Sequence, residues 1–163
     1  RAMLETNVLA LLAGSQAAIR AMRSCGAEGH IVNISSIAAQ RNDSGVYGAT
    51  KHAVNCIHAT LRRELENDTI RVVNVMPGAI ATNFARNFDP AFVAGFVKAT
   101  GVEVEVKKGE RLPDEVVEKL QPALKQVLGH ADDVAKAVLY AVTQPIEVNV
   151  AEIVVRPPRQ IAL

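Results

Sequence analysis

The sequence predicts the second half of a doubly wound α/β fold, in which helices cover both faces of a parallel sheet. Three apolar, β-branched runs, at residues 30–37, 69–75 and 146–155, have the length of buried strands. Segments of helical composition separate these runs. Strands that are apolar on both faces and alternate with helices are typical of parallel sheets rather than antiparallel ones.

Residues 2–23 open the chain as a helix rich in Ala, Leu and Met, and Gly26 closes it. Apolar side chains occur on nearly every face, so we expect this helix to be buried on two sides. It begins without an initiating Met and without a capping residue ahead of it. We therefore expect an N-terminally truncated chain, in which the first strand exposes an apolar edge prone to aggregation.

The segment R-N-D-S-G at 41–45 has loop composition, and a second helix is predicted from Val46 to about Glu66. The strand at 69–75 follows this helix. Pro77-Gly78 then stops the strand abruptly, because proline cannot donate to a strand ladder. The order of elements so far is helix, strand, helix, strand.

The stretch from residue 79 to 112 is irregular, apart from a short helix predicted after Asp89-Pro90. There the aspartate suits the N-cap and the proline suits the first helical position. Short helices are predicted at 114–120 and 122–128. A firmer one is predicted at 132–142, where the acidic start suits the helix dipole.

Composition excludes several classes of function. The net charge is +1 and the basic residues are scattered, so we expect no nucleic-acid partner. No apolar run approaches the roughly 20 residues of a membrane helix, so we expect no membrane partner. The cysteines, Cys25 and Cys56, and the histidines lack metal-ligand spacing, so we expect no metal site. Two reduced thiols favour a cytoplasmic protein.

Polar residues of complementary chemistry follow the predicted strand ends, where ligands bind in open α/β sheets. The first strand ends at Ser35-Ser36, and the next helix carries Tyr47 and Lys51. Positions four apart share one face of a helix. A nearby ammonium lowers the pKa of a phenol from about 10 toward neutral pH, which suits acid–base catalysis. The alternative is an exposed helix with a half-buried ring and a solvated amine.

The chain resembles the catalytic half of the short-chain dehydrogenase/reductase family in four segments. These are T-N-V at 6–8, N-I-S-S at 33–36, Y-G-A-T-K at 47–51 and N-V-M-P-G-A-I-A-T at 74–82. The combination is specific, although Y-x-x-x-K alone is not. The resemblance implies a Rossmann-like sheet of which this chain holds the C-terminal half only. The N-terminal cofactor-binding strands are expected to be missing, so this chain alone should bind a dinucleotide poorly and be inactive.

The resemblance implies a catalytic group of four residues. Tyr47 donates a proton to a carbonyl oxygen during reduction, or removes one from a hydroxyl during oxidation. Ser36 orients that oxygen, and Lys51 binds the nicotinamide ribose and lowers the pKa of Tyr47. Asn7 holds a water that links Lys51 to solvent. Two alternatives stay open: Ser35 competes with Ser36, and Asn7 can equally be an ordinary polar residue of a helix.

The turn after the second strand resembles the family's contact with the nicotinamide carboxamide and a cofactor phosphate. Besides Tyr47 and Lys51, the implied cofactor-binding residues are Pro77, Gly78, Ile80 and Thr82. Proline and glycine suit a sharp turn close to a ligand. Thr82 has the alternative role of capping the next segment. NADP(H) is the favoured cofactor, with NAD(H) as the alternative.

All four phenylalanines lie in one region at helical spacing: Phe84, Phe88, Phe92 and Phe96. The corresponding region of the family is a mobile lid over the substrate, and apolar rings there would exclude water. The alternative is that the rings attach this insert to the sheet. We therefore expect residues 1–163 to form a single domain, with a lid-like insert at 79–112.

The resemblance implies an NAD(P)-dependent oxidoreductase that interconverts a small alcohol and a carbonyl. The closing segment at 148–160 resembles a subgroup of NADP-dependent serine and 3-hydroxy acid dehydrogenases. The alternative function is a noncatalytic subunit that serves as an assembly surface. Helices 2–23 and 46–66 usually form subunit contacts in the family, so we expect a homo-oligomer, either dimer or tetramer. A hydrolase that uses Ser36 is disfavoured, because the chain lacks a G-x-S-x-G elbow.

Overall fold

The computed structural model describes residues 1–159, so Gln160, the last residue of the closing segment, lies outside the described residues. The chain divides into two compact units. The first comprises Arg1–Pro77 and Val134–Val155, and it contains the sheet. The second comprises Gly78–Asp133 together with the described residues after Val155.

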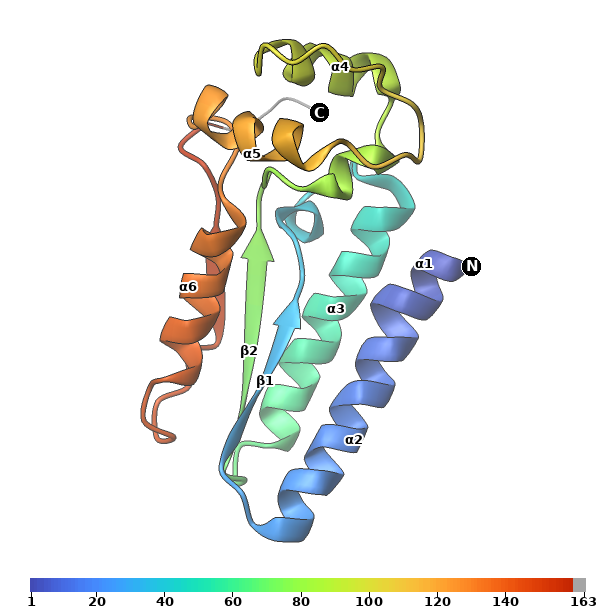
Figure 1. Cartoon of the computed structure of the whole chain (residues 1–163). Helices are drawn as coiled ribbons and strands as arrows, with labels where there is room; N and C mark the ends of the chain where they lie inside the picture. The colour runs from blue at the N-terminus through green and yellow to red at the C-terminus, as the bar shows by residue number, and fades with distance from the viewer. Residues whose placement is uncertain (160–163) are drawn as a thin grey trace. The chain divides into compact units, whose positions relative to one another are not determined.

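Three parallel strands form the sheet in the order β1-β2-β3 (Figure 1). Their bounds are Gly29–Ile34 for β1, Ile70–Pro77 for β2 and Glu152–Val155 for β3. The predicted α/β class with a parallel sheet is therefore confirmed. The third strand is shorter than predicted, because a turn that joins Val148 N to Pro145 O at 2.8 Å takes up the start of the predicted run.

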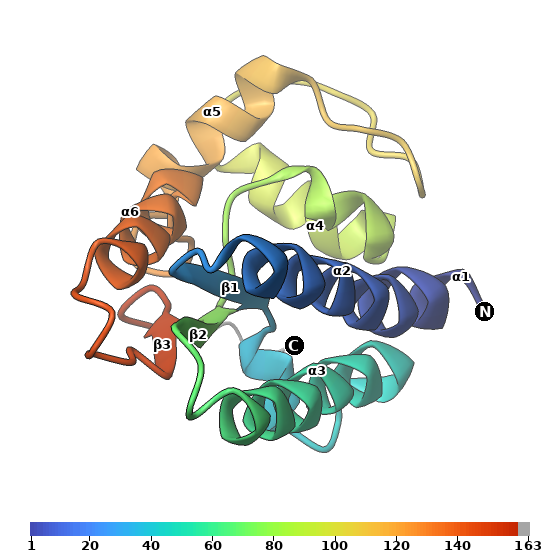
Figure 2. The same ribbon diagram turned by 90° about the horizontal axis from the view of Figure 1, so that it is seen from below.

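One face of the sheet is covered by two helical segments that lie side by side (Figures 1 and 2). The first segment consists of α1 (Ala2–Leu4), a π-helical turn η1 (Glu5–Leu9) and α2 (Ala10–Cys25). The second is α3 (Gly45–Glu64). Ile19 of α2, Ile31 of β1 and Leu61 of α3 belong to one apolar cluster beneath these helices.

The opposite face of the sheet packs against α6 (Ala131–Val142). Val73 and Val75 of β2 are fully buried there, against Val134 and Val138 of the helix. Burial of alternate β2 residues on both faces explains why the strand is apolar apart from Arg71 near its start and Asn74.

The expectation that the first helix is buried on two sides is wrong. Only Ser15 and Ile19 of α2 are buried, because β1 and α3 cover just one of its faces. Leu4 and Leu9 are 51% and 59% exposed. The segment Ala2–Cys25 is also long and apolar enough to cross a membrane, by length and composition only. From the sequence we expected no segment of this kind, because scattered charges interrupt the apolar residues of this helix.

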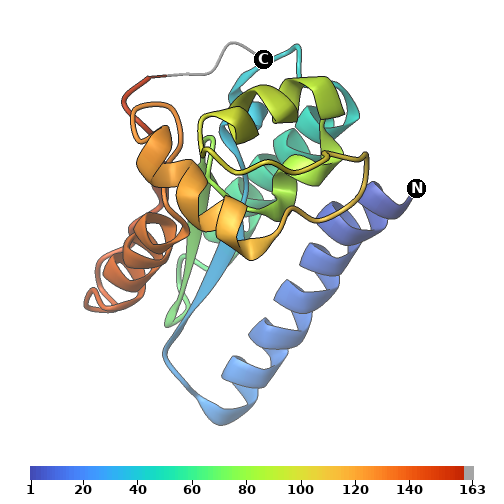
Figure 3. The ribbon, with the colours of Figure 1, turned by 45° about the horizontal axis from the view of Figure 1, so that its top comes forward.

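The second unit contains η3 (Asn83–Asn87), α4 (Pro90–Lys98) and α5 (Asp114–Ala123). A long connection joins α4 to α5 (Figure 3). Asp89 caps α4 as predicted, since its carboxylate accepts from Ala91 N at 2.9 Å and Phe92 N at 3.2 Å. Buried aliphatic residues hold the unit together: Val93, Val97, Leu112, Val116, Leu120 and Leu128.

The helix predicted at 122–128 is not formed. Pro122 lies in the last turn of α5, which ends one residue later at Ala123. Proline cannot continue a helix ladder, because it lacks the N–H group and its ring crowds the preceding turn. The backbone beyond forms turns in which Val127 N and Leu128 N both bond Leu124 O at 2.8 Å.

Candidate active site

Tyr47 and Lys51 lie one turn apart near the start of α3, and both side chains are half-buried. The Lys51 Nζ atom lies 5.8 Å from the centroid of the Tyr47 ring. The same amine donates to the carbonyl oxygen of Ile34, the last residue of β1, at 2.8 Å. Lys51 therefore contacts the phenol-bearing turn of the helix and the end of the neighbouring strand at once.

Partial burial changes the electrostatics of this lysine. Removal of water from around the amine lowers the pKa of Lys51 below its ordinary value of 10.5. An ammonium that faces an aromatic ring at this distance is held by the ring quadrupole. The positive charge is thus held beside the Tyr47 ring.

Ser36 lies two residues beyond Ile34, at the point where the chain leaves the sheet. It is the N-cap of the short helix η2 (Ile37–Gln40), and its Oγ accepts from Ala38 N at 3.1 Å. Its side chain is half-buried. Because the hydroxyl acts as an acceptor in this bond, its proton can be donated to a substrate oxygen.

Ser35 points the other way. Its hydroxyl is buried and donates to Asn55 Oδ1 at 2.7 Å. Adjacent residues of an extended chain direct their side chains to opposite sides, so when Ser35 faces α3, Ser36 faces away from that contact. Of the two serines, the structure therefore leaves Ser36 as the one accessible to a ligand.

Asn7 lies in the π-helical turn η1, which the backbone closes with a bond from Ala10 N to Glu5 O. Its Nδ2 donates to Thr50 Oγ1 at 3.0 Å, and Thr50 in turn donates to Tyr47 O at 2.8 Å. The side chain thus contacts the helical turn that carries Tyr47. Single π turns inside α-helices are frequent at functional sites.

Two residues of the Y-G-A-T-K segment were not singled out by the sequence reasoning. Thr50 is buried and joins Asn7 to the backbone of Tyr47. Gly48 is also buried, and a Cβ atom there would lie 2.7 Å from Ser44 Cβ and 3.3 Å from Ala38 O. The glycine permits the turn after β1 to approach α3 closely. The sequence signal that could have pointed to Gly48 is its position directly after Tyr47.

The predicted cofactor turn spans the junction between the two units. Pro77 is the last residue of β2 in the first unit, and Gly78 begins the second. Ile80 forms an isolated parallel bridge with Gly129 within the second unit. Thr82 caps η3, since its Oγ1 accepts from Phe84 N at 3.3 Å. The capping role that the sequence left open for Thr82 is therefore present.

The four phenylalanines form a chain of edge-to-face ring contacts in the second unit. Successive ring centroids lie 5.7, 6.1 and 4.9 Å apart. Phe92 and Phe96 pack against the apolar core of that unit, whereas Phe84 and Phe88 are exposed. The packing role thus applies to the last two rings, whereas the first two lie at the surface of that unit.

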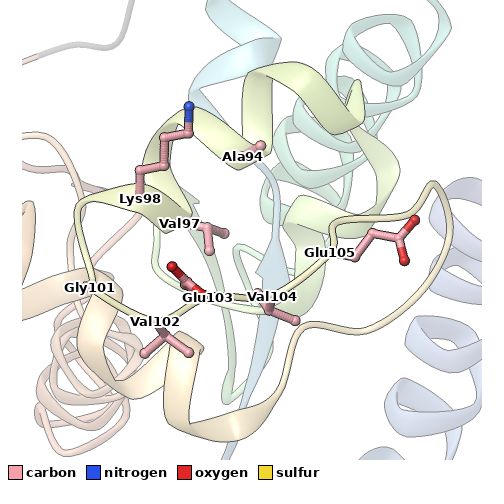
Figure 4. Close-up of a pocket in the computed structure, with 8 residues that line it drawn as sticks. All are labelled: Ala94, Val97, Lys98, Gly101, Val102, Glu103, Val104 and Glu105. Carbon is pink, nitrogen blue, oxygen red and sulfur yellow. The ribbon is translucent and has the colours of Figure 1, made fainter.

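A cavity of about 690 Å³ lies beside α4 in the second unit (Figure 4). Its lining residues are Ala94, Val97, Lys98, Gly101, Val102, Glu103, Val104 and Glu105. Its three charged residues are all exposed, and Glu105 forms an ion pair with Lys107 at 3.4 Å. None of the four phenylalanines lines it. Its walls therefore combine aliphatic side chains with exposed charged ones, and none of the residues that line it is a buried polar residue that would fix a ligand.

Comparisons with known proteins show which family the chain matches. The family described as short chain dehydrogenase matches residues 1–92. The matched range includes Asn7, Ser36, Tyr47 and Lys51, together with the turn at Pro77. The matched part thus contains every residue implied in catalysis.

Curated relatives match nearly the whole chain. Farnesol dehydrogenase from Aedes aegypti is 30% identical over 163 residues, which cover 96% of this chain and 54% of that protein. An uncharacterized oxidoreductase from Staphylococcus aureus is 32% identical over 157 residues, which cover 95% of this chain and 53% of that protein. This chain spans about half the length of the curated relatives it matches.

Among solved structures, the closed form of serine dehydrogenase complexed with NADP+ superposes with a TM-score of 0.66. It is 25% identical, and the match covers 94% of this chain and 54% of that structure. Serine dehydrogenase from Escherichia coli has a TM-score of 0.64 at 24% identity, with 96% and 52% covered. At this lower identity the likeness supports the fold alone.

Proposed function

Because this chain belongs to the short-chain dehydrogenase family, we propose that the protein is a nicotinamide-dependent oxidoreductase that interconverts an alcohol and a carbonyl. The observation that carries the proposal is the contact of Lys51 with the ring of Tyr47 and with the end of β1 next to Ser36. A phenol, an ammonium and a hydroxyl then serve one reaction centre. Each has a chemically distinct task.

The proposed proton donor during reduction is the hydroxyl of Tyr47. A carbonyl oxygen that gains negative charge takes this proton, and the reverse reaction returns it to the phenolate. The Lys51 ammonium stabilises the phenolate, because opposite charges favour the ionised form of a nearby acid. Ser36 donates a hydrogen bond to the same substrate oxygen and so fixes its position.

The residues present suit a nicotinamide cofactor. The Lys51 amine carries three donors, and Tyr47 adds a hydroxyl on the same helix face, a donor set that suits the hydroxyls of a ribose. The bound nicotinamide would supply or accept the hydride. NADP(H) is proposed over NAD(H), supported by the similar serine dehydrogenase that is complexed with NADP+.

We propose a small hydroxy acid or its carbonyl counterpart as the substrate class. The support is the likeness to serine dehydrogenase, together with the resemblance of the closing segment to the serine and 3-hydroxy acid subgroup. The exposed rings of Phe84 and Phe88 are proposed to be the substrate-facing part of the lid. Phe92 and Phe96 support them from the core of the second unit.

We also propose that the protein is a homo-oligomer that uses the first helical segment (α1, η1 and α2) and α3 as its contact surface. Met3, Leu4 and Leu9 on the first helical segment and Val46 on α3 are all exposed. Adjacent exposed apolar residues on neighbouring helices are typical of protein–protein contacts. The same surface favours the second candidate function, a noncatalytic subunit.

We propose a cytoplasmic location for the protein. The support is the unpaired thiols of Cys25 and Cys56.

The test is to express the complete reading frame that contains this sequence and to follow NADPH and NADH oxidation with small ketones, aldehydes and keto acids. Tyr47→Phe keeps the ring and removes the proton donor, so we expect kcat to fall by about 10²–10⁴-fold. Tyr140→Phe, at an exposed tyrosine of α6, is the matched control and should leave kcat unchanged. Equal turnover by the Tyr47→Phe variant would refute the proposed proton donor. Absence of turnover in the wild type would favour the noncatalytic subunit.

A further inference from the structure

Asn55 lies one helical turn beyond Lys51 and two turns beyond Tyr47, on the same side of α3. Its Oδ1 atom accepts two hydrogen bonds. One comes from Ser35 Oγ at 2.7 Å, and the other comes from Asn74 Nδ2 at 2.9 Å. Ser35 is 3% exposed and Asn74 is fully buried, so both bonds are shielded from water.

These two donors belong to neighbouring strands of the sheet. Ser35 directly follows β1, and Asn74 lies within β2. One amide oxygen on α3 therefore ties the helix to the residue that follows β1 and to β2 at a position three residues before its last residue, Pro77. The first of these links lies directly before Ser36.

The end of β1 is thus attached to α3 at two successive residues. Ile34 O accepts from Lys51 Nζ at 2.8 Å, while the hydroxyl of the next residue, Ser35, donates to Asn55. The Ser35 Oγ atom also lies 3.3 Å from Lys51 O. A hydroxyl has one proton, so the shorter bond to Asn55 takes it. The backbone that leads into Ser36 is held by these contacts.

We propose that Asn55 is a positioning residue that fixes the strand end carrying Ser36 relative to the helical turns carrying Tyr47 and Lys51. This inference rests on the proposed function for its catalytic consequence. Among the described residues, the other amide atom, Asn55 Nδ2, makes only a long contact of 3.9 Å to Met76 Sδ. The acceptor oxygen is therefore the part of the side chain that carries the role.

Two substitutions separate the acceptor from the bulk of the side chain. Asn55→Leu keeps the volume and removes the acceptor. Asn55→Asp keeps an acceptor oxygen for both donors, while it loses the weak sulfur contact and adds a negative charge. The matched control is Asn33→Leu: Asn33 is also buried, pairs in register with Asn74 and shares its face of the sheet, but its Nδ2 has no partner among the described residues.

The first readout is amide hydrogen exchange of residues 35–39, which does not depend on activity. Loss of the link should raise exchange at Ala38 and Ala39, which bond to Ser36, by roughly tenfold, the factor that matches one lost hydrogen bond. We expect this in Asn55→Leu and not in Asn55→Asp or Asn33→Leu. Ser35→Ala removes the donor from the strand side and should reproduce the effect, which keeps the test decisive where Asn55→Leu fails to fold.

The second readout is kinetics of the complete protein. Asn55→Leu should lower kcat at least tenfold with less than a twofold change in KM, and Asn55→Asp should restore most of kcat. Unchanged exchange in both Asn55→Leu and Ser35→Ala would overturn the inference, and so would an equal rise in Asn33→Leu. A wild type without turnover would refute the proposed function alone, because the exchange experiment would still decide whether Asn55 fixes the strand end.

Discussion

Lys51 carries its charge in a half-buried environment, which disfavours the protonated amine. Its amine is held between the Tyr47 ring and Ile34 O, and the burial that results lowers its pKa. The unfolded chain therefore binds more protons than the folded chain at pH values between the two pKa values. In that window the contribution of Lys51 to the free energy of unfolding rises with pH.

Lys51→Met removes this dependence while it keeps an unbranched side chain. We expect the free energy of unfolding of the wild type to rise relative to that of the variant as pH increases toward 10.5, the ordinary pKa of lysine. Urea unfolding of both proteins at several pH values between neutrality and this limit measures the difference. A difference that stays constant with pH would show that burial does not perturb this amine.

Gly48 allows a second test at the level of one residue. A Cβ there would meet Ser44 Cβ at 2.7 Å and Ala38 O at 3.3 Å, so Gly48→Ala must displace the turn that follows Ser36. We expect a loss of about 1–3 kcal/mol in the free energy of unfolding, as for overpacked cores. Thermal denaturation measures it.

The matched control is Gly14→Ala in α2, where no atom lies within 4 Å of the new Cβ. It should stabilise the protein by about 0.5–1 kcal/mol, because alanine is the better helix former. Equal effects of the two substitutions would contradict the close approach at Gly48.

Single residues also show why the site was only partly predictable. Ser36, Tyr47 and Lys51 are recognisable because their spacing follows from a strand, a loop and one helical turn. The hydrogen bond from Ser35 to Asn55 could not be recognised from the sequence, because it joins two side chains that are 20 positions apart. The π turn around Asn7 depends on a shifted backbone bond, which local composition does not encode.

At the scale of elements, the buried face of α3 contains a histidine that lowers the stability of the fold. His58 is 1% exposed, and neither ring nitrogen has a partner within the part of the chain that the structure describes. Burial lowers the pKa of His58 below 6.5, nearby Arg62 lowers it further, and Glu152 opposes the shift. The imidazole therefore stays neutral and leaves polar atoms unsatisfied in the core.

His58→Leu should raise the free energy of unfolding by about 1–2 kcal/mol, because it removes buried polar atoms without hydrogen bonds. The folded-state pKa is depressed, so the wild type also loses stability as pH falls below 6.5, where the unfolded chain gains a proton. The variant lacks this loss. Chemical denaturation at neutral and mildly acidic pH measures both effects, and parallel pH profiles would contradict the prediction.

Elements defined by local chemistry were predicted well from the sequence. Asp89 and Pro90 start α4, Pro77 ends β2, and Gly26 ends α2 with a positive φ of 65°. Elements whose bounds depend on packing partners were predicted less well. β3 pairs with β2 over four residues only, although the predicted strand began earlier, at residue 146. Burial of the first helix was misjudged for the same reason, since composition does not reveal how many faces meet a neighbour.

At the scale of the whole molecule, the first helix and α3 present the surface proposed for self-association. Leu9→Glu places a charge at a position that is 59% exposed, so we expect it to shift the oligomer toward monomer while the fold is retained. Sedimentation of the complete protein at several concentrations measures this shift. Leu139→Glu on α6 is the matched control, because Leu139 is 61% exposed outside the proposed surface. A monomeric wild type would contradict the assembly.

The segment between residues 79 and 129 of the second unit is closed at its base by a short ladder. Gly129 N donates to Ala79 O at 2.9 Å, and Ala81 N donates to Gly129 O at 3.0 Å. Because this short ladder closes the base of the segment, its length and loops can diverge without altering the register of the strands from which it departs. The segment between is therefore a self-contained unit that we expect to be exchangeable among homologues.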